Sequence, residues 1–152
     1  MRFITKKEKK YSFIEAGEGH PLILLHGLMG GLSNFDKTVK YFSERGYKVF
    51  VPVLPIYDLP VLHTKLTTIA KYVAKFIEEN TDEPATIVGN SMGGHIVLIL
   101  TLARPEFFAN LVLTGSSGLY ERTFGDIFPY RRKFFHTDQN CLLRLSLQQA
   151  LG

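Results

Sequence analysis

The sequence has 152 residues, 45% of them hydrophobic and 21% charged, proportions that are ordinary for a single soluble globular domain. The formal net charge of +4 comes largely from basic clusters at 6–10 and 131–133. Neither cluster is interleaved with regularly spaced aromatics, so we interpret both as solvated faces, with no nucleic-acid or membrane partner. The lone Cys141 excludes an internal disulfide, no stretch approaches the roughly 20 apolar residues of a membrane span, and the N-terminus lacks a signal-peptide core. These features predict a cytoplasmic protein.

Strands and helices are predicted to alternate along the first 115 residues. A weakly alternating strand at 11–15 is expected at an edge of the sheet, whereas the later apolar runs are typical of strands buried on both faces. The buried strands are predicted at 22–25, 47–54, 85–89 and 111–114. Strands and helices that alternate at this spacing indicate an α/β protein with a doubly wound, mostly parallel sheet.

Three helices are predicted between these strands. The first is expected to be capped by Ser33 or Asn34 and to end at Gly46. The second carries an apolar stripe between 69 and 77. The third is apolar on nearly all sides, as expected for a helix buried beside a central strand, and it should end before Pro105, because the residue preceding a proline disfavours the α conformation.

The segment 86–95, Thr-Ile-Val-Gly-Asn-Ser-Met-Gly-Gly-His, joins a predicted strand to the third helix through a Gly-x-Ser-x-Gly pattern. This order places Ser91 at the apex of a tight strand-to-helix turn, which is the position of the nucleophile elbow in serine hydrolases. A Cβ at Gly89 or Gly93 would clash there, and Ser91 must accept a strained backbone for its hydroxyl to project from the sheet. The alternative is a glycine-rich turn of another α/β protein, for example one that binds a phosphate, although the nucleotide-binding fingerprints are absent.

With this motif and with Leu-Ile-Leu-Leu-His-Gly-Leu at 22–28, the sequence resembles the α/β-hydrolase superfamily, in particular its small bacterial esterases and carbon–carbon-bond hydrolases. A third matching run is Leu-Val-Leu-Thr-Gly-Ser at 111–116, and the resemblance covers about 11–120. The resemblance implies the α/β-hydrolase fold with Ser91 as the nucleophile. A serine at this position argues against the branches that use an aspartate nucleophile, the haloalkane dehalogenases and epoxide hydrolases.

The resemblance also implies an oxyanion hole made by the backbone N–H groups of Met92 and Leu28. Two such donors would stabilise the negative charge of the tetrahedral intermediate, and losing one typically lowers the rate by about a hundred- to a thousandfold. His26, Gly27 and Met29 form the surrounding loop and are expected to face the substrate. His26 is expected to shape this loop rather than to act as a base.

The sequence departs from the family where the acid and the base of the catalytic triad should follow the nucleophile. Beyond the helix that follows Ser91, His136 is the only histidine, and it is therefore a weak candidate for the base. The available acids, Glu121, Asp126 and Asp138, follow no recognisable strand. Because geometry and not composition makes a triad, we interpret these residues as coincidental and identify neither an acid nor a base.

The other histidines have structural interpretations. His95, one helical turn beyond Ser91, is expected to pack or to hydrogen-bond locally, and His20 and His63 are expected in surface loops. No pair of histidines or carboxylates has metal-ligand spacing, so we expect neither a metal nor a cofactor.

The sequence after about 120–128 does not match the family, and we expect a shortened chain. In this interpretation 1–128 is the N-terminal portion of an α/β-hydrolase domain whose C-terminal part is missing. The remaining 129–152 would be an atypical tail, either a truncated lid, an out-of-frame product or an interaction helix. A sheet that stops at 111–114 would leave an uncovered edge, which predicts self-association.

Two functions are open from the sequence. The first is a serine hydrolase that cleaves an ester, a thioester or an activated carbon–carbon bond of a small molecule through an acyl-enzyme on Ser91. The second is a catalytically incompetent, truncated or degenerate hydrolase fold that at most binds a small ligand. The elbow and the oxyanion loop favour the first function for the family, whereas the unidentified base leaves the two evenly balanced for this chain.

Overall fold

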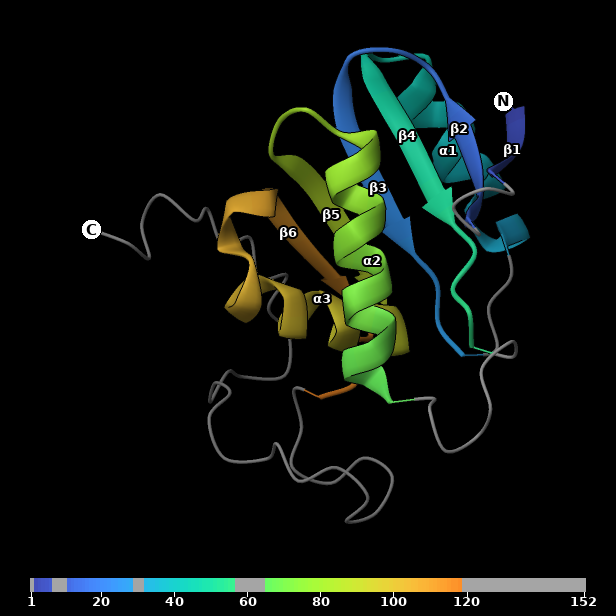
Figure 1. Ribbon diagram of the computed structural model, residues 1–152. Helices are drawn as coiled ribbons and strands as arrows, with labels where there is room; N and C mark the ends of the chain where they lie inside the picture. The colour runs from blue at the N-terminus through green and yellow to red at the C-terminus, as the bar shows by residue number, and fades with distance from the viewer. Residues whose placement is uncertain (1, 7–10, 29–31, 57–64, 119–152) are drawn as a thin grey trace.

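The computed structural model describes residues 2–6, 11–28, 32–56 and 65–118, which form one six-stranded sheet with helices on both faces (Figure 1). The strands are β1 (Arg2–Lys6), β2 (Tyr11–Ala16), β3 (His20–Leu25), β4 (Tyr47–Pro52), β5 (Ala85–Asn90) and β6 (Phe108–Thr114). The α-helices are α1 (Asp36–Ser43), α2 (Leu66–Asn80) and α3 (Met92–Ala103), and 3-10 turns occupy Leu32–Phe35 and Pro105–Phe107. No helix in the described part of the chain has both the length and the apolar character needed to cross a membrane.

The strand order across the sheet is β1-β2-β4-β3-β5-β6. Strands β4, β3, β5 and β6 run parallel to one another, whereas β1 and β2 are antiparallel additions at one side. On β5, Ile87 lies between Ile23 of β3 and Leu111 of β6, and all three side chains are buried. The predicted mostly parallel α/β sheet, with β5 between the strands at 22–25 and 111–114, is therefore confirmed.

Each face of the sheet has its own apolar core. Because successive side chains of a strand point to opposite faces, Ile23 and Leu25 pack in the core under α2 and α3, while Leu22 and Leu24 pack on the α1 side. In Figure 1, α2 and α3 lie in front of the sheet and α1 lies behind it. The predicted doubly wound arrangement, with helices on both faces, is confirmed.

Helix α3 is buried nearly all round beside β5, as the sequence predicts. Ile96, Val97 and Leu100 are at most 2% exposed, whereas Leu102, near the C-terminal end of the helix, is a large apolar side chain exposed to solvent. The helix ends at Ala103, directly before the Arg104-Pro105 pair that was expected to stop it.

The predictions for the edge strand and for both ends of the first helix are wrong. The strand at 11–15 is not the edge of the sheet, because β1 pairs antiparallel with β2 along its outer side. Neither Ser33 nor Asn34 caps α1, since the chain enters this helix through the 3-10 turn and Phe35 occupies the cap position without a side-chain hydrogen bond. The helix ends at Ser43, and Gly46, with φ of 79°, lies in the turn that follows.

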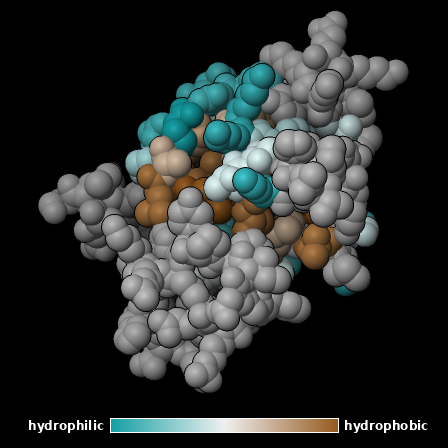
Figure 2. All heavy atoms as spheres, turned by 60° about the horizontal axis from the view of Figure 1, so that its bottom comes forward, coloured by the Kyte–Doolittle hydropathy of each residue, from teal (hydrophilic) through white to brown (hydrophobic). Residues whose placement is uncertain are grey.

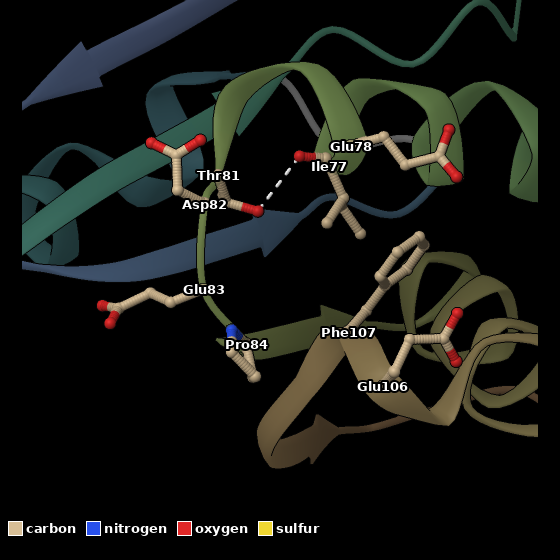
Figure 3. Close-up of a pocket in the computed structure, with 8 residues that line it drawn as sticks. All are labelled: Ile77, Glu78, Thr81, Asp82, Glu83, Pro84, Glu106 and Phe107. Carbon is tan, nitrogen blue, oxygen red and sulfur yellow. Dashed lines mark hydrogen bonds between the residues drawn. The ribbon is translucent and has the colours of Figure 1, made fainter.

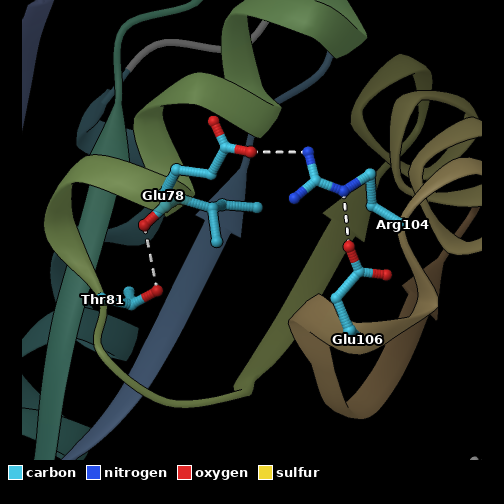
Figure 4. Close-up of polar contacts among 5 residues, drawn as sticks. Glu78, Thr81, Arg104 and Glu106 are labelled. Atoms are coloured by element: carbon cyan, nitrogen blue, oxygen red, sulfur yellow. Dashed lines mark hydrogen bonds and ion pairs between the residues drawn. The ribbon is translucent and has the colours of Figure 1, made fainter.

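A polar junction joins the end of α2 to the end of α3 (Figure 4). The Arg104 guanidinium donates from Nη1 to Glu78 Oε1 at 2.6 Å and from Nε to Glu106 Oε1 at 2.5 Å, and it lies over the ring of Phe107. The hydrogen bond from Arg104 holds the pKa of Glu106 below its usual value. These groups are exposed to solvent, where salt screens ion pairs, so the junction orients the two helix ends more than it stabilises the fold.

Candidate active site

Ser91 lies in the turn between β5 and α3 with φ of 51° and ψ of −117°. It is the only residue other than glycine with a positive φ in the described part of the chain, and its side chain is exposed. A backbone of this kind costs about 1–3 kcal/mol and persists only where the surrounding structure determines it. The prediction that Ser91 stands at a strained strand-to-helix turn is confirmed.

The glycines around Ser91 are required by close backbone contacts. A Cβ at Gly89 would lie 2.5 Å from Gly94 Cα, and a Cβ at Gly93 would lie 2.3 Å from the carbonyl oxygen of Leu25. The structure thus confirms that a Cβ at either glycine would clash, as predicted. Gly94 is also required, because its Cβ would lie 2.4 Å from Ser116 Oγ in the loop after β6.

The last residue of β6 and the loop after it hold the backbone of the turn. The Ser91 N–H donates to Thr114 O at 3.1 Å, and the Asn90 side chain donates from Nδ2 to Thr114 O at 3.1 Å and to Thr114 Oγ1 at 3.0 Å. The Ser91 carbonyl oxygen accepts from Ser117 N at 3.1 Å and from Ser117 Oγ at 3.3 Å. No local sequence pattern marks Thr114 or Ser117 as a support of the site, so neither residue was predicted.

The His26-Gly27 segment after β3 lies against the nucleophile position. A Cβ at Gly27 would come within 3.0 Å of Ser91 Cβ and 3.4 Å of Ser91 Oγ, so the two segments are in close contact. The next residue, Leu28, is 49% exposed, and apolar residues reach the surface at this end of the molecule (Figure 2). Met29 lies outside the described residues.

His26 is buried and uses both ring nitrogens in the structure. Nδ1 donates to Gly27 O at 2.9 Å, and Nε2 accepts from the N–H of Leu54 at 3.3 Å. Because a carbonyl oxygen only accepts and an amide N–H only donates, these partners define the neutral tautomer protonated on Nδ1. His26 thus ties the loop after β3 to the loop after β4 and offers no nitrogen for proton transfer.

His20 does not lie in a loop, as the sequence predicted, but begins β3 at the opposite end of the sheet from Ser91. Its Nε2 lies 3.2 Å from Thr86 Oγ1 and its Nδ1 lies 3.3 Å from Glu83 Oε1. The apolar run that marks this strand begins only after His20, so no local pattern includes His20 in it. The partners of His20 hold it far from Ser91.

The weak base candidate His136 lies outside the described residues, and so do the acids Glu121, Asp126 and Asp138 and the loop residue His63. Within the ranges 2–6, 11–28, 32–56 and 65–118, no histidine hydrogen-bonds to the Ser91 hydroxyl, and no group of three or more histidine, cysteine or acidic side chains could hold a metal ion.

A shallow hollow lies between α2 and the 3-10 turn before β6 (Figure 3). Its lining includes the apolar Ile77 and Phe107 and the acidic Glu78, Asp82 and Glu83. Glu83 precedes β5 whereas Ser91 follows it, so this hollow is at the end of the sheet away from the nucleophile position. We therefore place the candidate active site at the Ser91 turn.

His95 lies in the first turns of α3, where its ring packs closely on Gly118: a Cβ at Gly118 would lie 2.9 Å from His95 Nδ1. Burial lowers the pKa of His95 from 6.5, because desolvation disfavours the charged imidazolium. The packing predicted for this residue is confirmed.

This shift predicts a pH dependence of stability. The pKa of His95 is lower in the folded than in the unfolded chain, so between the two pKa values the unfolded chain binds more protons. Folding is therefore favoured above the unfolded pKa, and stability is lost as the pH falls toward the folded pKa. Chemical unfolding from about pH 7.5 to about pH 5 should show a larger loss for the wild type than for His95→Gln. Parallel pH curves for the two proteins would contradict this.

Comparison with known proteins agrees with this geometry. A family described as alpha/beta hydrolase fold matches residues 20–140, and the chain belongs to it. The 2-hydroxy-6-oxononadienedioate/2-hydroxy-6-oxononatrienedioate hydrolase of Comamonas testosteroni is 33% identical over 135 residues, which are 81% of this chain and 47% of that protein. The chain thus spans about half the length of the curated relatives it matches.

Solved structures show the same likeness. An alpha/beta hydrolase enzyme from the metagenome of sediments of the Mar Chica lagoon in Morocco is 46% identical with a TM-score of 0.74, over 80% of this chain and 54% of that one. An esterase from Exiguobacterium antarcticum is 27% identical with a TM-score of 0.70, over 84% of this chain and 49% of that one. The relatives are therefore carbon–carbon-bond hydrolases and esterases.

Proposed function

We propose that the protein is a serine hydrolase that cleaves an ester, a thioester or an activated carbon–carbon bond of a small molecule through an acyl-enzyme on Ser91. The observation that carries this proposal is the exposed Ser91, held at φ of 51° between β5 and α3. A strained and solvent-accessible serine at the N-terminus of a buried helix is the arrangement that a nucleophile elbow requires.

The surroundings of Ser91 fit the steps of acyl transfer. Its hydroxyl oxygen attacks the substrate carbonyl carbon, a base takes the hydroxyl proton, and the leaving group departs with that proton to give the acyl-enzyme. Water then hydrolyses this ester. The backbone N–H groups of Met92, at the start of α3, and of Leu28, next to the close Gly27–Ser91 contact, are the proposed donors to the oxyanion.

The substrate class follows from the relatives and from the surface. The Comamonas testosteroni relative is named for the hydrolysis of a hydroxy-oxo dienedioate, and other relatives are esterases. The partly exposed Leu28 and the apolar residues at this end of the molecule suit a small organic substrate (Figure 2). The loop residues His26, Gly27 and Met29 are proposed to line its binding site.

The alternative is an incompetent hydrolase fold that at most binds a ligand. Within the residues that the structure describes, no histidine is bonded to Ser91 Oγ, so this alternative holds unless a residue outside them supplies the base. Without its histidine, the triad of a subtilisin loses about six orders of magnitude in rate. The distinction depends on whether a base, with His136 as the candidate, reaches Ser91.

Covalent labelling separates the two functions. A fluorophosphonate reacts with a serine only where a base and an oxyanion hole surround it, so the hydrolase function predicts one adduct, located at Ser91 by peptide mass mapping. Ser91→Ala should abolish this adduct. If His136 is the base, His136→Ala should abolish it as well. A folded wild-type chain without an adduct would support the incompetent alternative.

A further inference from the structure

The Ser91 carbonyl oxygen accepts more hydrogen bonds than its helix supplies. From α3 it accepts Gly94 N at 3.1 Å and His95 N at 3.4 Å, which are ordinary bonds of a first helical turn. From the loop after β6 it also accepts Ser117 N at 3.1 Å and Ser117 Oγ at 3.3 Å. A single residue from another part of the chain thus donates twice to one carbonyl oxygen, next to the strained residue of the turn.

This carbonyl belongs to the same peptide unit as the N–H of Met92. The six atoms of a peptide unit are coplanar, and in a trans peptide the C=O and the following N–H point in opposite directions. Since no cis peptide occurs among the described residues, holding the Ser91 oxygen also sets the direction of the Met92 N–H. Hydrogen bonds accepted at the oxygen polarise the unit and make that N–H a stronger donor.

We infer that Ser117 is a positioning residue that aims and polarises the Met92 N–H through the Ser91 carbonyl. The inference rests on the proposed function, in which this N–H donates to the oxyanion. Ser117 has no role in the chemistry itself. Its hydroxyl acts through the Ser91–Met92 peptide. The stabilisation that the Met92 N–H gives to the oxyanion grows as negative charge develops in the transition state.

Other groups hold the turn without acting on this peptide unit. Asn90 bonds to Thr114, and the Ser91 N–H also bonds to Thr114, so these contacts hold the peptide unit that precedes Ser91. The Ser116 hydroxyl donates to the carbonyl of Ser117 at 2.9 Å and not to that of Ser91. Substitution of the Ser117 side chain is therefore the specific test of how the Met92 N–H is oriented.

One spectroscopic signal reports on this peptide unit. Ser91-Met92 is the only Ser-Met pair in the sequence, so a chain labelled with ¹³C-carbonyl serine and ¹⁵N-methionine gives a single cross-peak in an HNCO spectrum. In Ser117→Ala the carbonyl loses a hydrogen bond, and we expect the Ser91 ¹³C and Met92 ¹H resonances to move upfield. Ser117→Thr keeps the hydroxyl and should restore the wild-type position.

The kinetic consequence is a selective loss of turnover. Losing one hydrogen bond that matters in the transition state should lower kcat for an ester such as p-nitrophenyl butyrate about tenfold with KM unchanged. Ser43→Ala is the matched control, because Ser43 Oγ also donates to a backbone carbonyl, that of Lys40 at 3.1 Å, but does so on α1. This control should leave both the cross-peak and the rate in place.

The two proposals fail in different ways. A wild-type chain that neither hydrolyses the ester nor reacts with the fluorophosphonate contradicts the serine hydrolase function, and the cross-peak still decides whether Ser117 controls the Ser91–Met92 peptide. An unmoved cross-peak in folded Ser117→Ala, or a failure of Ser117→Thr to restore it, overturns the inference. So does an active Ser117→Ala whose kcat equals that of Ser43→Ala.

Discussion

Gly93→Ala is expected to destabilise the folded chain by at least about 3 kcal/mol, or to prevent folding altogether. The new Cβ would lie 2.3 Å from Leu25 O and 2.8 Å from His26 O, and both atoms belong to the backbone at the end of a buried strand. Helix propensity alone predicts that the substitution stabilises the fold, since alanine is about 1 kcal/mol more favourable than glycine inside a helix. Urea unfolding followed by circular dichroism therefore separates the steric effect from propensity.

Gly46→Ala is the matched control for this substitution. A Cβ at Gly46 would have no atom within 4 Å, but φ there is 79°. The loss should be only the conformational cost of a left-handed alanine, about 1–2 kcal/mol. A Gly93→Ala chain as stable as Gly46→Ala would show that β3 and α3 do not approach as closely as the structure indicates.

Ser91→Gly should be more stable than Ser91→Ala by about 1 kcal/mol, which is about 2–4 °C in Tm for a chain of this size. Both variants lack the hydroxyl, but only glycine accepts φ of 51° with ψ of −117° without strain. The relief of about 1–3 kcal/mol exceeds the roughly 0.5–1 kcal/mol by which glycine loses more backbone entropy on folding. Thermal unfolding of the two variants measures this difference directly.

The same pair of substitutions in an ordinary helix supplies the control. Lys71 is exposed within α2, where glycine should be about 1 kcal/mol less stable than alanine. The order of the two variants should therefore reverse between positions 71 and 91. If alanine is preferred at both positions, the Ser91 backbone is not strained, and the structural support for a nucleophile elbow is lost.

The sequence by itself determined the central strands, the three helices and the elbow of this protein. Apolar runs marked the buried strands, and the Gly-x-Ser-x-Gly pattern located Ser91 at the strand-to-helix turn, because these features depend on neighbours only a few residues away. The same local steric reasoning identified Gly89 and Gly93, whose Cβ atoms would meet backbone. The roles of Met92 and Leu28 in an oxyanion hole stay predictions.

Only the tertiary structure decided what surrounds that turn. The bonds from Ser117 to Ser91 and from Leu54 to His26 join residues that are 26 and 28 positions apart. Likewise, the outer strand β1 became recognisable only through its pairing with β2. Such contacts arise from strand order and register, which bring distant segments together at one end of the sheet. Local periodicity does not predict these pairings, because each segment has the pattern of its own helix, strand or loop whether or not its partner is present.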